Sequence, residues 1–505
     1  MRAFSTIEIL LALAIMTTTV VAVTLITLGM PIAIAQARLE YAGYQKIDGL
    51  LQKNSVLARA NFDAVTSIAT TTDGIYEVSL EAILLSDEIT KRLTARAHWI
   101  NARGLSQDIS LSVLVTDPNN IDESHCSGSL LGDWSTPVVL NSYSVTPGGL
   151  LPLITPYDQY PVSDVALGSG LLALAIDATV NTSSPELFVF KVDSFGGLVP
   201  YGGGHDNAPA SRFGFSGVVI HKGKIFAANS FGSGSNATCK VSHNCDQLQI
   251  FSSDDPHTST YLSSLQLATT APPFAVSSGG ISAGAKSIVY KKGFVYLGLV
   301  KTITGSEFNI IDVSDPQSPV WKGGARVGRT INHISVSGSY AYLATDDNAR
   351  ELMVFDIRDP ANPTLIGSWN APGGVGFGYG TASAIQNENI YFGRSYVSNA
   401  PELVMLSGHD VSSITEIGSR DIGTRLNPES IRDLAVRDFL TFVLTDSKLQ
   451  IWETEDPATP LLYGEVLPFS RASTATSLAC KNNSLYIGGY ENTGNVGHLS
   501  IITSS

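Results

Sequence analysis

Residues 352–369 read LMVFDIRDPANPTLIGSW: an apolar strand, an Asp-Pro turn and a second apolar strand. Proline has no backbone N–H to donate and therefore ends a central strand. The same apolar run with Asp-Pro at its end returns in three more segments: LQIFSSDDP at 248–256, FNIIDVSDP at 308–316 and LQIWETEDP at 449–457. The pattern predicts an internal repeat built from antiparallel strands.

The repeat has a second recurring part, a polar turn that leads into an apolar strand. The average period of about 50 residues is close to that of four-stranded propeller blades. Short strands before this turn and after the Asp-Pro segment bring each repeat to four strands. The seven turns begin at residues 168, 222, 291, 337, 387, 437 and 481.

Counting the strands leaves the last repeat one strand short. The chain ends at HLSIITSS, residues 498–505, and DWSTPVVLNSYSV at 133–145 has the pattern of the outer strands. We expect this segment to complete the last sheet and to remove an open edge. Residues 133–505 are thus predicted to form a seven-bladed β-propeller, and the segment at 352–368 resembles the LVIVD-repeat propellers. An open pair of β-sandwiches is the alternative fold.

The N-terminal part of the chain is a long apolar run. Ile9 to Ala37 contains no charged residue, and Ile7 to Leu28 would cross about 30 Å of hydrocarbon as a helix. A secretory signal fits poorly because the apolar core is too long, so a retained transmembrane helix over 7–29 is predicted. This implies a single-pass cytoplasmic membrane protein with an extracytoplasmic C-terminus.

Glu8 places a carboxylate at the start of this run, where burial in lipid is costly unless the charge has a partner. A glutamate at the interface of an anchor helix is one interpretation. The segment AFSTIEILLALA at 3–14 resembles the leader of type IV pilins and pseudopilins, with Ala3 where that family usually has Gly. The resemblance implies a leader peptide at 1–3, cleavage after Ala3 by a prepilin peptidase and a methylated amino group on Phe4. It also implies that Glu8 neutralises the N-terminus of a neighbouring subunit during assembly.

Helical periodicity continues beyond the apolar run and predicts a helix over 4–69. Alternating runs then predict a small antiparallel sheet at 70–120, followed by a linker at 121–132. The runs lie at 75–85, 92–104 and 107–118. The predicted fold class is mainly β with a long N-terminal helix: a pilin-like helix and small sheet, followed by the propeller.

The four cysteines fit an oxidising compartment. Cys239 and Cys245 are close in sequence, so a local disulfide is expected. A bridge between Cys126 and Cys480 would fasten the closing strand to the last sheet, although sequence does not give the distance between them. The alternative is a loop thiol at Cys126 and a buried thiol at Cys480.

The search for chemistry yields no enzyme motif that we would assign. The nine histidines form no H-E-x-x-H or H-x-H sequence. GGVGFGYG at 373–380 lacks the Lys and Ser/Thr of a phosphate loop and is predicted to be an inter-blade loop. Asp254 with Asp255, or Asp346 with Asp347, could join a calcium site, although neither fits an EF-hand loop. No enzyme, catalytic residue, metal or other cofactor is therefore predicted.

Composition and the two resemblances together define the expected function. Only 15% of residues are charged, and the net charge of -14 without a basic block argues against nucleic acid as a partner. We expect a minor or tip pilin that is membrane-inserted before assembly, joins other pilin subunits in a cell-surface pilus-like filament and presents the propeller for adhesion. A protein or glycan ligand would bind the loops at 231–245, 299–308 and 369–380.

Two alternatives come from other functional classes. One is a structural pilin or secretion pseudopilin in which the propeller is a spacer. The other is a membrane-anchored extracytoplasmic propeller enzyme. The enzyme requires charged or metal-binding side chains that converge on the propeller axis, and the blade sequences do not display such a cluster.

Overall fold

The computed structural model divides into two compact units, Met1–Ile121 and Asp122–Ser505. The structure describes residues 35–58, 62, 64–84, 90–101, 104–116, 132–145, 161–177, 186–193, 197–204, 214–230, 246–253, 260–267, 283–302, 305–372, 378–386, 388–398, 400–469, 473–481, 483–492 and 496–505.

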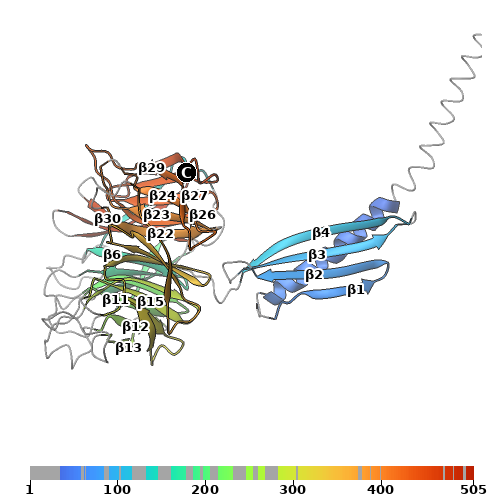
Figure 1. Ribbon diagram of the computed structural model, residues 1–505, viewed down its shortest axis with the longest axis horizontal. Coiled ribbons are helices and arrows are strands. Elements are labelled where there is room, and N and C mark those ends of the chain that lie inside the picture. The colour runs from blue at the N-terminus through green and yellow to red at the C-terminus, as the bar shows by residue number, and fades with distance from the viewer. Residues whose placement is uncertain are drawn as a thin grey trace, which may run out of the picture. The chain divides into compact units, whose positions relative to one another are not determined.

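In the N-terminal unit a helix lies along one face of an antiparallel sheet (Figure 1). Alternation along the third strand directs Leu93, Ala95 and Trp99 to one face, where they are buried against Ile47 and Leu51 of the helix. The helix is thus held by one apolar stripe with helical spacing. The helix covers residues 35–58, and the strands, in sheet order, are β1 (Ile68–Asp73), β2 (Tyr76–Leu84), β3 (Thr90–Ile100) and β4 (Ser106–Thr116).

This unit differs from the prediction where the helix gives way to the sheet. The helix was expected to continue to residue 69, but β1 already begins at Ile68, and the sheet has four strands where three were expected. All six residues of β1, IATTTD, are exposed, so the strand has no apolar face from which a period could be recognised. Its β-branched residues favour a strand, and Gly74, at a φ of 71°, turns the chain into β2.

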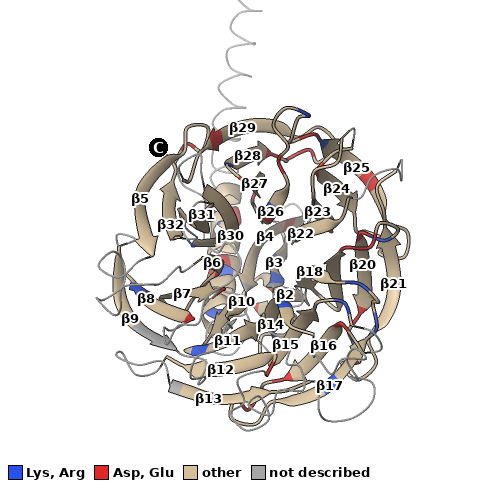
Figure 2. Ribbon diagram, turned by 90° about the vertical axis from the view of Figure 1, so that its left-hand side faces the viewer, with Lys and Arg blue, Asp and Glu red and all other residues tan. Residues whose placement is uncertain are grey.

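In the C-terminal unit the described residues form seven four-stranded antiparallel sheets. Figure 2 shows them around a common centre, with the first strand of each sheet innermost. The first six sheets are β6 (Val162–Gly168), β7 (Leu171–Ile176), β8 (Leu187–Val192) and β9 (Leu198–Gly204); β10 (Phe215–His221), β11 (Lys224–Asn229), β12 (Leu248–Ser252) and β13 (Thr260–Leu265); β14 (Ala285–Lys291), β15 (Phe294–Leu299), β16 (Phe308–Asp312) and β17 (Val320–Ala325); β18 (Ile331–Ser337), β19 (Tyr340–Thr345), β20 (Leu352–Asp356) and β21 (Thr364–Trp369); β22 (Gly380–Gln386), β23 (Asn389–Arg394), β24 (Leu403–Ser407) and β25 (Thr415–Arg420); and β26 (Ile431–Arg437), β27 (Leu440–Thr445), β28 (Leu449–Glu453) and β29 (Leu461–Val466).

The seventh sheet is completed by a strand that precedes all the others of the ring. It contains β30 (Ser473–Lys481), β31 (Ser484–Glu491), β32 (Gly497–Thr503) and β5 (Val138–Val145) in that order. β5 pairs antiparallel with β32, opposing Val145 to Gly497 and Val138 to Thr503. Each innermost strand contacts the next, and β30 contacts β6, so the last sheet meets the first. This architecture is consistent with a seven-bladed β-propeller.

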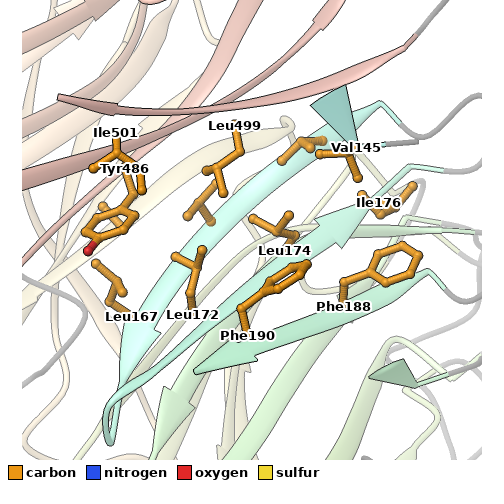
Figure 3. Packing of buried hydrophobic residues seen from close by; sticks show 13 residues of the cluster. Val145, Leu167, Leu172, Leu174, Ile176, Phe188, Phe190, Tyr486, Leu499 and Ile501 are labelled. Carbon is orange, nitrogen blue, oxygen red and sulfur yellow. The ribbon is translucent and has the colours of Figure 1, made fainter. Parts of the chain in front are cut away.

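Apolar side chains fill the space between neighbouring sheets of the ring. Between the last sheet and the first, Tyr486, Leu499 and Ile501 pack with Leu172 and Phe190 (Figure 3). β7, with the sequence LLALAI, is buried at every position, because its sheet is covered on both faces.

Tight turns join the third and fourth strands and pack against the preceding sheet. In the turn after β20, Asp359 Oδ1 accepts a hydrogen bond from Ala361 N at 3.0 Å, and Asp315 and Asp456 make the same contact in their sheets. These acids therefore cap turns. Gly367 in β21 allows the next turn to approach, because a Cβ added there would lie 1.8 Å from the carbonyl oxygen of Val411.

In the described part of the chain, no helix has both the length and the apolar character needed to cross a membrane. This finding contradicts the expectation of a single-pass membrane protein, which is therefore withdrawn. Residues 7–29, on which that expectation rested, lie outside the described residues.

Candidate functional site at the axis of the ring

Each innermost strand of the ring contains one extra residue near its start, which interrupts its pairing with the second strand. In the first sheet the pairing passes from Val162↔Ile176 to Asp164↔Ala175 and skips Ser163. The same shift occurs in the other six sheets. Such bulges redirect the side chain that follows. The residues after the bulge, here named the axial layer, are Asp164, Gly217, Ser287, His333, Ala382, Asp433 and Ser477.

The axial layer joins neighbouring sheets. Wherever it offers a polar side chain, that side chain accepts a hydrogen bond from a backbone N–H of the next innermost strand. Gly217 and Ala382 have no acceptor to offer. The five bonds are Val218 N to Asp164 Oδ2 (2.8 Å), Ile334 N to Ser287 Oγ (3.0 Å), Ser383 N to His333 Nδ1 (3.3 Å), Leu478 N to Asp433 Oδ2 (2.8 Å) and Val165 N to Ser477 Oγ (3.1 Å).

Two carboxyl groups of the axial layer titrate near neutral pH. Desolvation by burial raises the pKa of Asp164 to about 6, although hydrogen bonds from Ser477 and from two backbone N–H groups lower it. Desolvation also raises the pKa of Asp433 to about 7, and the charge of Asp164 raises it further. The titration of Asp433 therefore depends on the charge of Asp164.

His333 reaches toward this pair from a third sheet. Its Nε2 lies 4.0 Å from Asp433 Oδ1, and its Nδ1 accepts the backbone N–H of Ser383. This contact places the proton of the neutral ring on Nε2, which faces the carboxyl group. The side chains of His333 and Asp433 remain 30% and 16% exposed. They are thus deep in the ring and still reachable by water.

Charged side chains at the bulge positions lie next to the axial layer. Lys286 Nζ donates to Asn332 Oδ1 at 2.8 Å, and Arg432 Nε donates to Asp446 Oδ1. Desolvation lowers the pKa of Lys286, whereas the charge of Asp346 raises it and that of Arg432 lowers it. Each cation therefore has an acidic neighbour, and the two lie close enough to interact.

This arrangement can bind protons and polar ligands at the axis. Two carboxyl groups and an imidazole come from three sheets, and with pKa values of about 6 and about 7 the two carboxyl groups can exchange protons with solvent near neutral pH. Among the described residues, no three His, Cys, Asp or Glu side chains are grouped so that they could hold a metal ion.

The grouping of Asp164, His333 and Asp433 at the axis was not predicted. The blade sequences were expected to lack charged side chains that converge on the axis. Asp164, His333 and Asp433 each stand beside other polar residues, in VSDVALG, INHISVS and IRDLAVR. They occupy the third position in all three strands. Aligning the innermost strands on that position would have revealed them.

The residues predicted to act in processing and assembly, Ala3, Phe4 and Glu8, lie outside the described residues, and their roles stay predictions. Cys126, Cys239 and Cys245 also lie outside them. Cys480 is buried in β30 and is not a free thiol. The pairings of Cys239 with Cys245 and of Cys126 with Cys480 stay predictions.

Of the two acidic pairs considered for calcium, the structure describes only Asp346 and Asp347. Asp254 and Asp255 lie outside the described residues. Asp346 Oδ1 accepts the backbone N–H of Thr330, and Asp347 pairs with Arg350 at 3.1 Å and with Arg329 at 3.6 Å. Two guanidinium groups beside Asp347 neutralise the charge that a calcium ion would require.

The three loops predicted to bind a ligand connect strands whose adjoining ends lie at the same end of the ring. The loop at 231–245 joins β11 to β12, that at 299–308 joins β15 to β16, and that at 369–380 joins β21 to β22. In a four-stranded antiparallel sheet the second and the fourth strand run in the same direction and end on the same side. The connection from the second to the third strand and the connection to the next sheet therefore start at the same end of the ring. Residues 231–245, 303–304 and 373–377 themselves lie outside the described residues.

One stretch of the sequence has the spacing of a nucleophile elbow. Residues 280–284, GISAG, have G-x-S-x-G spacing. They lead into the innermost strand β14, whereas a nucleophile elbow joins a strand to a helix. Ser282 lies outside the described residues.

Comparison with known proteins identifies part of the ring. The LVIVD repeat model matches residues 284–325 and 328–371. These two segments are LVIVD repeats. They contain β14–β17 and β18–β21, so one LVIVD repeat corresponds to one four-stranded sheet. No curated protein matches the chain.

Solved structures also match the chain, and one is a complex from S. cerevisiae described as a Dbp5 variant bound to Nup159, a Gle1 variant, IP6 and ADP. The match covers 75% of this chain and 98% of the other, with 9% sequence identity and a TM-score of 0.42. At that similarity it supports no statement about function.

Proposed function

We propose that the chain is a type IV pilus-like subunit, a minor or tip pilin, whose ring binds a protein or glycan partner. The observation that supports this best is the N-terminal unit, in which a helix packs by one stripe on a four-stranded antiparallel sheet. This is the arrangement of a pilin head, and it stands beside the leader-like sequence around Glu8. The likeness of fold is an analogy and needs a direct test.

A second feature of the same helix supports assembly. Tyr41, Tyr44, Val56 and Leu57 are apolar or aromatic and exposed, although they lie on the helix that buries Ile47 and Leu51 in the unit's own core. Exposed apolar groups of this size are typical of surfaces that pack against another chain. Other pilin helices are the partners that the proposal assigns to them.

The ring supplies the binding surface in this proposal. Its ligand loops leave at one end, and adjacent sheets are tied together at the axis by hydrogen bonds of the axial layer. A rigid scaffold that displays variable loops is well suited to recognition. A purely structural pilin with a spacer ring is the alternative outcome.

The test is intact mass and N-terminal sequence of the chain recovered from sheared filaments. We expect a start at methylated Phe4, loss of the Glu8→Ala variant from filaments and retention of Glu40→Ala, which removes an exposed carboxylate from the same helix. A chain that starts at Met1 and is absent from filaments would overturn the proposal. Normal filaments that bind no partner through the ring would favour the spacer.

A propeller enzyme is the second candidate, and the convergence of Asp164, His333 and Asp433 favours it. An acid and a base with pKa values near the working pH are what proton-transfer catalysis needs. Substitution distinguishes the two roles. Asp433→Asn and His333→Gln should abolish turnover by an axial enzyme, whereas both variants should keep partner binding by the loops.

A further inference from the structure

His333 and Asp433 face each other across the axis from sheets that are not neighbours. His333 is on β18 and Asp433 on β26, and β22 lies between these strands in the order of the ring. Each side chain accepts a hydrogen bond from a backbone N–H of the next sheet. His333 Nδ1 accepts from Ser383 N, and Asp433 Oδ2 accepts from Leu478 N. Nε2 and Oδ1 are thereby turned toward each other at 4.0 Å.

We propose that His333 and Asp433 form a proton-linked lock: a proton taken up by this pair tightens the ring across its axis, and its loss at higher pH loosens the ring. The lock is independent of filament assembly. It adds a regulatory device to the ring, whatever partner the loops bind.

The proton resides on the Asp433 carboxyl group. There it removes the repulsion between this carboxylate and that of Asp164. His333 stays neutral, so its Nδ1 keeps accepting the backbone N–H of Ser383, and its protonated Nε2 faces Asp433 Oδ1 at 4.0 Å. Because the proton comes from solvent, no other reactant is needed.

The surroundings of Asp433 leave few other groups that could account for its titration. In the described residues, β6 contributes Asp164 and β18 contributes His333, whereas β22 and β30 contribute Ala382 and Ser477 at the same level. The nearby cations Lys286 and Arg432 lie one position earlier, and each has an acidic neighbour. A proton is thus the simplest charge that can balance the two carboxylates.

The direction of the pH effect follows from the raised pKa values. An Asp in the unfolded chain titrates near its model value of 3.8, whereas Asp433 in the ring titrates at about 7. Between these values the folded ring holds a proton that the unfolded chain does not, so unfolding releases it. The stabilisation is fully present below the unfolded pKa and is lost as the pH rises through about 7.

Urea unfolding of the full chain between pH 5 and pH 8 tests the lock. For the wild type, the unfolding constant should rise by up to about tenfold per pH unit for each proton released. Asp433→Asn removes the titrating carboxyl group and leaves one of the two backbone donors, Leu434 N or Leu478 N, without its acceptor at every pH. It should therefore be less stable overall but show a clearly smaller rise, and His333→Gln should show an intermediate one. Asp410→Asn is the matched control, because this exposed turn aspartate has a lowered pKa and titrates below the range.

Infrared titration of the protonated carboxyl band provides a measurement that does not depend on unfolding. A band component that disappears at about pH 7 in the wild type, the pKa of Asp433, and is missing from Asp433→Asn supports the lock. The same pH dependence in the wild type, Asp433→Asn and His333→Gln would overturn it. A band that still disappears at about pH 7 in Asp433→Asn would also overturn it, because that proton would then belong to another group; the band of Asp164, with a pKa of about 6, should remain in both proteins.

Discussion

Glu351 and Arg394 form an ion pair that is almost completely buried between two neighbouring sheets of the ring. Their side chains are only 4% and 3% exposed. Arg394 Nη2 donates to Glu351 Oε1 at 2.9 Å, Arg394 Nε donates to Oε2, and Nη1 donates to the carbonyl of Pro401 at 2.6 Å. The two-pronged contact links the segment before β20 to the end of β23.

Breaking this pair from one side should be costly. Arg394→Met leaves the carboxylate buried without a counter-ion, and we expect the free energy of unfolding to fall by about 3–5 kcal/mol. The double variant Glu351→Met/Arg394→Met should recover a large part of the loss. Denaturant unfolding gives both values. Lys448→Met, which breaks the partly exposed pair with Glu465, should cost under about 1 kcal/mol. Equal losses for Arg394→Met and Lys448→Met would contradict the argument.

Two glycines should respond in opposite ways to the same substitution. Gly367→Ala places a methyl group 1.8 Å from the Val411 carbonyl oxygen, so the turn must move, and a loss of about 1–3 kcal/mol is expected. Gly49→Ala adds a methyl group to the helix at 35–58 with nothing within 4 Å. Better helix propensity should raise stability by about 0.5–1 kcal/mol. Thermal unfolding of both variants checks the signs, and a neutral Gly367→Ala would show that the turn is not held.

The segment before β5 should contribute strongly to closure of the ring. Trp134 is 2% exposed and meets Phe442 of the sixth sheet edge to face, with ring centroids 5.1 Å apart. Trp134→Ala should lower the unfolding free energy by about 3–5 kcal/mol. Val139→Ala, at an exposed position of β5, should cost under about 1 kcal/mol. If the urea midpoints of the two variants coincide, closure does not depend on Trp134.

Ser477→Ala should destabilise the ring more at pH 8 than at pH 5. Ser477 Oγ donates to Asp164 Oδ1 at 2.6 Å and thereby lowers the pKa of Asp164, which is about 6. Without this donor the pKa rises further, and the ionised carboxylate loses stabilisation above pH 6. We expect a loss of about 1 kcal/mol at pH 8 and less at pH 5.

Ser412→Ala is the matched control for that experiment. It removes the equivalent donor to Asp410, at 2.6 Å, from an exposed turn. The pKa of Asp410 is already lowered, by Ser412 first of all, so the change should fall below pH 5. A pH-independent loss in Ser477→Ala would mean that Ser477 acts only through its bond from Val165 N.

Much of the ring was predictable because its strands are regular and repeated. Buried runs such as LLALAI and the Asp-Pro turns recur, and the missing fourth strand of the last repeat pointed to residues 133–145. β1 escaped prediction because all of its residues are exposed.

The axial layer escaped prediction for a different reason. Asp164 and His333 do not stand out from the other polar residues of their strands, and the bulges bring them to equivalent positions. Their chemistry depends on distances between sheets that are far apart in sequence. A single strand carries no sign of those distances.

The pairing of β5 with β32 also governs the order in which this protein can mature. During synthesis β5 leaves the ribosome before the other strands of the ring. Its pairing with β32 can form only after Thr503, the partner of Val138, has been synthesised. Until then two strand edges stay open, which is a state prone to mispairing. A message cut short before the codons of β32 would therefore yield a chain with nearly every blade and no closed ring, a product that proteases and chaperones can recognise by its exposed edges.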